Sequence, residues 1–144
     1  MEDLIGRVFL NNKMEEVNPE EVLNCKLIAL LFTASWCSPC VIFEKELIEL
    51  YSEANIGDKM LEIVHISSDR TEEAFKKSLG NKPWVFLPYH SNKIGELVSK
   101  YSVLAVPVFL VLRSSDCQIV TETGRKELSE EGVKVIDRWL SQVS

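Results

Sequence analysis

The chain has 144 residues, of which 46% are hydrophobic and 26% are charged, with six Gly and five Pro. These values fit a globular protein of about one domain and exclude a disordered, collagen-like or low-complexity chain. The net charge of −6 argues against non-specific binding to nucleic acid, which requires a basic surface. We therefore expect a single domain over residues 1–144 and no nucleic-acid partner.

The first part of the chain predicts a hairpin, a short helix and a buried strand. Residues Val8–Leu10 and Met14–Val17 flank a three-residue polar turn, which indicates a β-hairpin. The segment Asn18–Glu21 offers a capping Asn, a Pro at the first helical position and a Glu three residues after the cap, so it predicts a helix over 19–24. The nearly all-apolar run Lys26–Thr33 is typical of a strand covered on both faces, as in a mostly parallel sheet.

The middle of the chain continues the alternation of helices and strands. A long amphipathic helix is predicted over Cys37–Ala54, and a second buried strand over Leu61–Ser67. A short helix is predicted within 69–80, where a Gly ends it, and the proline-containing segment Asn81–Tyr89 is predicted to be a loop. A further helix is expected over Ser91–Tyr101, with the Ser as its cap.

The last third predicts a second hairpin and a C-terminal helix. The hairpin strands are Pro107–Leu112 and Gln118–Thr123, and the helix begins at about Ser129. Strands that alternate with helices and end in a hairpin and a helix predict an α/β fold. We expect a central mixed β-sheet flanked by helices on both faces, with the N-terminal β-hairpin as an extension.

No segment of the sequence is typical of a membrane protein or a secreted one. The longest apolar run, Val103–Leu112, has ten residues and contains a proline, whereas a spanning helix needs about 20. The N-terminus reads MEDLIGRVFL, with an early acid and no long apolar core, so it does not predict a secretory signal. The expected location is the cytoplasm, with the nucleus as a second one, and no membrane partner is expected.

The segment Cys37-Ser38-Pro39-Cys40 is the strongest candidate for chemistry, because it follows a buried strand and opens the long helix. A helix N-terminus presents unpaired N–H groups and a partial positive charge, which favour a thiolate. Cys37, at the end of the helix, is the expected nucleophile. Cys40, one turn further on, is placed to attack a mixed disulfide formed at Cys37. Pro39 stiffens the turn at a position where its missing N–H matters little.

Two other interpretations of these cysteines stay open from the residues alone. A Cys-x-x-Cys pair supplies half of many zinc sites, and the remaining candidate ligands are scattered singly: Cys25, Cys117, His65 and His90. The pair could also be two inert buried thiols, since free Cys is often a small buried hydrophobe. Dithiol–disulfide chemistry is favoured, because the motif lies beside a βαβ pattern.

Isolated residues elsewhere are expected to have structural roles. Cys25 is expected to pack beside the first buried strand, and Cys117 to be exposed in a hairpin turn. His65, Trp84 and Trp139 are expected to belong to the core.

Several motifs in order along the chain resemble the tryparedoxin and nucleoredoxin branch of the thioredoxin superfamily. The first is Ala34–Cys40, in which a Trp precedes the Cys-x-x-Cys. The others are His65–Arg70 with Glu72 and Phe75, Lys82-Pro83-Trp84 with Pro88, Tyr101-x-Val103 before Val106-Pro107, and Gly124-Arg125-Lys126 with Gly132 and Trp139. The resemblance covers about residues 5–142, and its last motifs are most similar to nucleoredoxin-like proteins.

The resemblance implies a thioredoxin fold and protein disulfide reductase activity, with Cys37 as the attacking thiol and Cys40 as the resolving one. The Cys37–Cys40 disulfide would be the redox centre, so neither a cofactor nor a metal is expected. The implied partners are protein disulfide substrates, including signalling or transcription-regulatory proteins, and an upstream reductase or dithiol donor. The alternative is a redox-sensitive binding module that regulates a signalling partner with little turnover. The presence of Cys40 favours the enzyme, since a pure binder does not need it.

The resemblance also implies a substrate-binding groove. Pro107 matches the cis-proline of the family, which lies against the dithiol, although a proline in an apolar run also fits a strand edge or bulge. The backbone of Val106 would pair with the substrate chain like an added strand. Trp36 would line the same groove, with Ser38 and Pro39 beside it.

Two positions depart from the family pattern. Ser38 stands where many tryparedoxins and nucleoredoxins have Pro, and Leu31 stands where thioredoxins have a buried Asp that relays the proton of the resolving thiol. The relay for Cys40 must then come from water or from another acid. The candidates are Glu44, Asp69 and Glu72, each of which we expect to be a solvated charge at a helix end.

Overall fold

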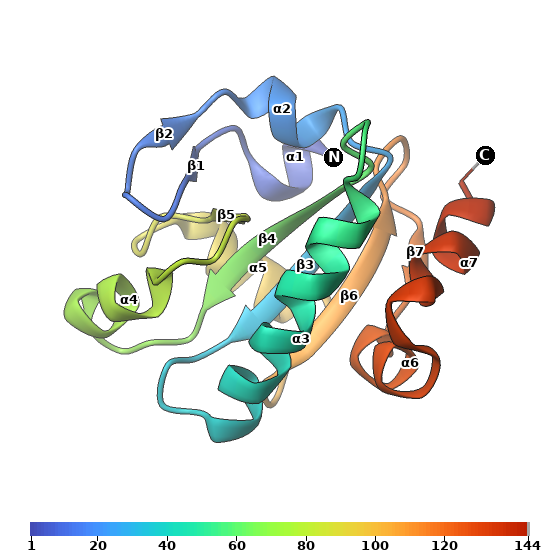
Figure 1. Cartoon of the computed structure of the whole chain (residues 1–144). Helices are drawn as coiled ribbons and strands as arrows, with labels where there is room; N and C mark the ends of the chain where they lie inside the picture. The colour runs from blue at the N-terminus through green and yellow to red at the C-terminus, as the bar shows by residue number, and fades with distance from the viewer. Residues whose placement is uncertain (144) are drawn as a thin grey trace.

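A mixed β-sheet forms the centre of the molecule in the computed structural model, which describes residues 1–143 (Figure 1). Its strand order is β2-β1-β5-β4-β3-β6-β7, and the central strand β3 pairs parallel with β4 and antiparallel with β6. The strands are β1 (Phe9–Leu10), β2 (Glu16–Val17), β3 (Leu27–Thr33), β4 (Leu61–Ser67), β5 (Val85–Phe86), β6 (Val108–Arg113) and β7 (Ile119–Thr121). The predicted mixed sheet is confirmed, and β1 of the N-terminal hairpin joins it by pairing with β5.

Helices cover both faces of the sheet, as predicted. They are α1 (Glu2–Ile5), α2 (Pro19–Leu23), α3 (Ser38–Ala54), α4 (Glu72–Leu79), α5 (Asn92–Lys100), α6 (Gly124–Glu131) and α7 (Val135–Ser141), with a 3-10 turn over Gly132–Lys134. In Figure 1, α3 crosses in front of the sheet and α5 lies behind it. In the part of the chain described, no helix is long and apolar enough to cross a membrane.

Burial on both faces of the sheet explains why β3 and β4 are mostly apolar in sequence. Successive side chains of a strand point to opposite faces of a sheet. Leu27, Ala29 and Leu31 of β3 accordingly pack into a cluster with α3 and α7. Ile28 and Leu30 pack into the second cluster, on the side of α5. Because both faces are covered, every residue of β3 and β4 is buried.

Two segments differ from the sequence prediction. The segment Asn81–Tyr89, predicted to be a loop, contains β5, which is only two residues long and bonds to β4 and β1. The C-terminal helix begins at Gly124 rather than near Ser129, and it is interrupted at Gly132, whose φ of 74° is left-handed. A continuing α-helix cannot contain this positive φ, which glycine tolerates, so the chain turns there before α7 begins.

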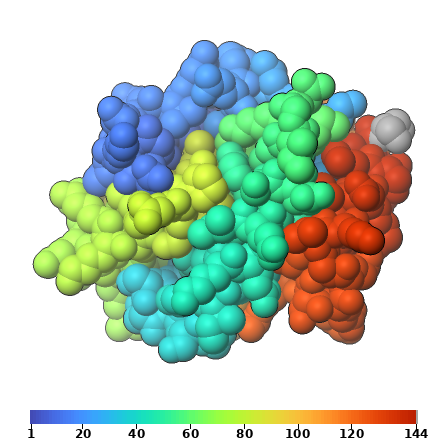
Figure 2. Space-filling view, in the orientation of Figure 1, coloured from blue at the N-terminus to red at the C-terminus, as the bar shows by residue number. Residues whose placement is uncertain are grey.

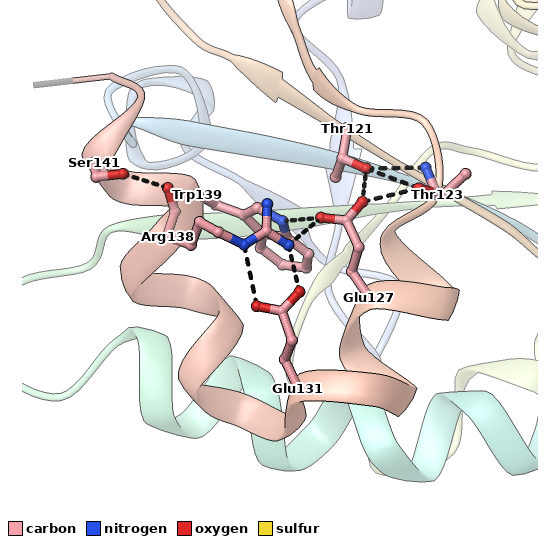
Figure 3. Close-up of polar contacts among 7 residues, drawn as sticks. All are labelled: Thr121, Thr123, Glu127, Glu131, Arg138, Trp139 and Ser141. Atoms are coloured by element: carbon pink, nitrogen blue, oxygen red, sulfur yellow. Dashed lines mark hydrogen bonds and ion pairs between the residues drawn. The ribbon is translucent and has the colours of Figure 1, made fainter.

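The C-terminal helices are fastened to β7 by a polar network around Glu127 (Figure 3). The indole N–H of Trp139 donates to its carboxylate at 3.0 Å, and Arg138 pairs with it at 2.6 Å and with Glu131 at 2.5 Å. The Thr121 hydroxyl of β7 also donates to Glu127. Burial raises the pKa of Glu127, but these hydrogen bonds outweigh burial and lower the pKa to about 2.

Replacing Gly124 should destabilise the contact between α6 and the sheet. A Cβ at this position would lie 2.6 Å from the Phe109 ring and 2.9 Å from the Phe109 carbonyl oxygen. We expect Gly124→Ala to lower the free energy of unfolding, measured in urea, by about 1–3 kcal/mol, the usual cost of overpacking. The matched control is Gly95→Ala in α5, where a Cβ meets nothing within 4 Å. It should raise the free energy of unfolding by up to about 1 kcal/mol. Equal stability of the two variants would contradict this packing.

His65 is a buried core residue, as predicted, and it should make the protein sensitive to mild acid. Its Nδ1 accepts from the indole N–H of Trp84 at 3.2 Å, and its ring lies on Phe86. Burial, together with the charge of Lys82, lowers the pKa of His65 to about 3. The unfolded chain binds a proton near pH 6.5 while the folded chain does not, so stability falls as the pH drops from about 6.5 toward 3.

The free energy of unfolding should be about 2 kcal/mol lower at pH 5 than at pH 7. His65→Gln, whose side-chain oxygen can accept from Trp84, should remove most of this loss. Urea unfolding of both proteins at the two pH values measures it. An equal loss in both would show that His65 is not the responsible group.

Candidate active site

The loop after β3 places Cys37 at the N-cap of α3, which begins at the next residue. The backbone N–H of Cys40 donates to Cys37 Sγ at 3.2 Å, in the manner of a helix-capping side chain. This donor and the partial positive charge of the helix N-terminus both face the Cys37 sulfur.

Cys40 lies one turn further along α3, and its environment differs from that of Cys37. Its side chain is fully buried, whereas Cys37 is 7% exposed, and both are free thiols. Burial raises the pKa of the Cys40 thiol to about 11, helped by its hydrogen bond with Cys37 and opposed by one with the Thr33 hydroxyl. Cys40 is therefore protonated at neutral pH, and Cys37 presents the sulfur that an incoming disulfide can reach.

The segment before β6 lies directly against the two cysteines. The Val106–Pro107 peptide bond is cis, as the resemblance implied. The Val106 carbonyl accepts from the Cys37 thiol at 3.8 Å, and the Val106 side chain packs against Ala34 and both cysteines. Val106 thus presents its backbone beside the reactive sulfur.

Apolar side chains are exposed around this site. Trp36 is 65% exposed, and Leu104, two residues before Val106, is 97% exposed. Ser38 and Pro39 are exposed on the first turn of α3. Exposed apolar groups beside a buried thiol pair offer a contact surface for a protein partner. The sequence analysis did not single out Leu104, because it belongs to a continuous apolar run.

A buried carboxylate fastens the cysteine loop to the end of β4. Asp69 Oδ1 accepts from the backbone N–H of Ser35 at 2.9 Å and from its hydroxyl at 2.7 Å, and Oδ2 accepts from Ser67 at 2.7 Å. Asp69 is 7% exposed, so the expectation of a solvated helix-end charge is wrong. These hydrogen bonds compensate the cost of burying the carboxylate.

Glu44, one turn after Cys40 on α3, is a second buried carboxylate. Its Oε2 accepts from the Thr33 hydroxyl at 2.5 Å, and its Oε1 pairs with Lys82 Nζ at 3.0 Å. Glu44 is 6% exposed, so the expectation of a solvated charge is wrong here too, because the two partners bury it. Glu72 is exposed and lies 4.0 Å from Lys76, as expected of a solvated helix-end charge.

Thr33 and Lys82 were missed as site residues, although the sequence held a signal for Thr33. Leu31 is buried in the core, and Thr33, two residues later on the same strand, points to the same face. Glu44 is four residues after Cys40, so the two side chains lie on one face of α3. Lys82 comes from the segment after α4, and only the folded chain brings it to Glu44.

The remaining cysteines lie at the other end of the sheet. Cys25 precedes β3, whose seven residues span about 20 Å before the cysteine loop begins, and it is buried as expected. Cys117 is half-exposed in the turn between β6 and β7. Over residues 1–143 no three His, Cys, Asp or Glu side chains come together as a metal site.

The chain matches the model of a family described as thioredoxin-like over residues 24–119. It is 36% identical over 115 residues to a protein named "Probable nucleoredoxin 3" from Oryza sativa subsp. japonica, covering 79% of this chain and 24% of that protein. It is 28% identical over 128 residues to nucleoredoxin from Xenopus laevis, covering 88% and 30%. The chain therefore spans about a quarter to a third of the length of these relatives.

Two solved structures have the same fold as this chain. The tryparedoxin from Trypanosoma brucei superposes with a TM-score of 0.80 at 28% identity, covering 92% of this chain and 91% of that one. The thioredoxin from Wuchereria bancrofti superposes with a TM-score of 0.79 at 30% identity, covering 96% and 97%. The predicted thioredoxin fold is confirmed.

Proposed function

Because the chain belongs to the thioredoxin-like family, we propose that it is a thiol–disulfide oxidoreductase that reduces protein disulfides through Cys37 and Cys40. The observation that carries the proposal is the pairing of two unlike thiols. Cys37 lies at a helix N-cap with a backbone donor on its sulfur, and Cys40 is buried behind it. Cys37 is thus placed to attack a substrate disulfide, and Cys40 is placed to resolve the mixed disulfide that results.

The reaction transfers two electrons from the dithiol to the substrate. The Cys37 thiolate attacks one sulfur of the substrate disulfide, a Cys37–substrate bond forms, and the first substrate thiolate leaves and takes up a proton. Cys40 then loses its proton and attacks Cys37 Sγ. The Cys37–Cys40 disulfide forms, the second substrate thiolate leaves, and it too is protonated. A dithiol donor or a reductase returns the protein to the reduced state.

The surface beside Cys37 suits an extended polypeptide. The backbone of Val106 would pair with the substrate chain, while Trp36 and Leu104 would contact its apolar side chains. Ser38 and Pro39, exposed at the start of α3, would contact the substrate beside them. The proposed substrates are therefore proteins, including signalling or transcription-regulatory proteins, and the proposed site of action is the cytoplasm, with the nucleus as a second location. The likeness to proteins named nucleoredoxins supports the proposed redox activity.

Reduction of insulin tests the proposal. The full chain is mixed with insulin and dithiothreitol, and precipitation of the freed insulin B chain is followed by turbidity. The proposal predicts that catalytic amounts of the protein accelerate precipitation over dithiothreitol alone. A rate equal to that of dithiothreitol alone would overturn it.

A further inference from the structure

The resolving thiol, Cys40, needs a group that takes its proton. It is fully buried, and the position from which thioredoxins supply a buried carboxylate is filled here by Leu31, as the sequence showed. The buried thiol has no direct contact with solvent. Its proton must therefore leave through groups that contact it.

A chain of polar groups runs from Cys40 into the molecule. The Thr33 hydroxyl donates to Glu44 Oε2 at 2.5 Å, and it lies close enough to the Cys40 thiol to lower the pKa of that thiol against the effect of burial. Thr33 comes from β3, whereas Cys40 and Glu44 come from α3, so the hydroxyl bridges the strand and the helix that carry the site. A hydroxyl can accept one proton while it gives up another, which suits it to pass a proton between the thiol and the carboxylate.

Glu44 lies between the ammonium group of Lys82 and a pocket at the surface. Lys82 pairs with it at 3.0 Å and also donates to the Ser78 carbonyl, so the ammonium is fixed in place. Glu44 lines a pocket of about 330 Å³ between α3 and α4, together with Lys45, Lys77 and Lys82. Among the described residues lining this pocket, Glu44 is the one acid. In Figure 2, α3 lies across the middle of the face, with the α4 region beside it.

We infer that Glu44, acting through the Thr33 hydroxyl, accepts the proton that Cys40 loses when its sulfur attacks the mixed disulfide at Cys37. The inference rests on the proposed function and assigns a positioning residue to its second step. The Cys40 proton passes to Thr33 Oγ1, and the Thr33 hydroxyl proton passes to Glu44 Oε2. The Cys40–Cys37 bond forms while the Cys37–substrate bond breaks, and the electron pair leaves on the substrate sulfur. Glu44 afterwards releases its proton to water through the pocket.

The test measures the two chemical steps separately. The reduced full chain is mixed with an equal amount of glutathione disulfide, quenched with acid at intervals, and analysed by mass spectrometry. Formation of the Cys37–glutathione adduct reports attack by Cys37, and its conversion to the Cys37–Cys40 disulfide reports resolution by Cys40. In Glu44→Gln, attack should be unchanged while resolution slows by about 100-fold at pH 7, the low end of what general-base catalysis contributes.

The pH profile separates a proton acceptor from a mere packing role. The difference in resolution rate should shrink as the pH rises, because hydroxide then removes the Cys40 proton without Glu44. Thr33→Val should slow resolution as Glu44→Gln does, and Thr33→Ser, which keeps the hydroxyl, should restore it. Glu46→Gln removes the same charge from an exposed position of α3 and should leave both steps unchanged.

Two results would overturn the inference while leaving the proposed function intact. One is a Glu44→Gln protein that resolves the adduct as fast as the wild type. The other is a variant in which both steps slow equally at every pH, which would show a structural disturbance. A wild-type protein that forms no Cys37–Cys40 disulfide would instead overturn the proposed function and the inference together.

Discussion

Cys37→Ala should abolish the reduction of insulin, leaving the rate of dithiothreitol alone. The fold offers no substitute nucleophile at the site, because Cys40 is fully buried and burial raises its pKa to about 11. Such a thiol carries almost no thiolate at neutral pH, and the thiolate is the species that attacks a disulfide. The expected loss is therefore complete rather than partial. Turbidity measured beside the wild type checks it.

The matched control removes the two cysteines at the far end of the sheet. The double variant Cys25→Ala, Cys117→Ala should keep the wild-type rate, because β3 separates these thiols from Cys37 by about 20 Å. Residual acceleration by Cys37→Ala, or loss of activity in the double variant, would contradict the assignment of the nucleophile.

Cys40→Ser should stop turnover after the first step and leave the substrate covalently attached to Cys37. The serine keeps the small buried side chain but lacks a sulfur that can break the mixed disulfide. Each protein molecule should then hold one substrate thiol, which mass spectrometry of the unreduced protein detects. With insulin as substrate the catalytic acceleration should disappear, although Cys37 still reacts.

The same variant decides between an enzyme and a binding module. An enzyme needs Cys40 to release its substrate, so Cys40→Ser should accumulate the adduct and lose turnover. A variant that forms no adduct, or that turns over at the wild-type rate, would contradict the role of Cys40 as the resolving thiol. Regulation of a partner that survives unchanged in this variant would favour binding without turnover.

Local patterns in the sequence predicted the elements that carry the site. The mostly apolar runs ending at Thr33 and Ser67 correspond to β3 and β4, because strands buried on both faces are rich in apolar residues. The capping position of Cys37 follows from the helix that starts at the next residue. The short strand β5 was missed, because two residues between prolines carry no periodicity and only their pairing partners make them a strand.

The buried acids could not be predicted from local patterns. Asp69 and Glu44 resemble ordinary helix-end charges in the sequence, and each is buried only because distant residues bond to it. Ser35, which bonds to Asp69, is 34 positions away, and Lys82, which pairs with Glu44, follows α4. The sequence correctly showed that Leu31 cannot relay a proton, but the position of Lys82 beside Glu44 depends on the packing of α4 against α3.

A redox titration of the purified protein tests the central claim most directly. The chain is equilibrated in glutathione buffers of graded potential, its free thiols are alkylated, and mass spectrometry locates the disulfide. The account predicts one reversible Cys37–Cys40 disulfide with a midpoint between about −270 and −200 mV, the range of thioredoxins and glutaredoxins. The absence of a reversible disulfide between these two thiols would contradict it.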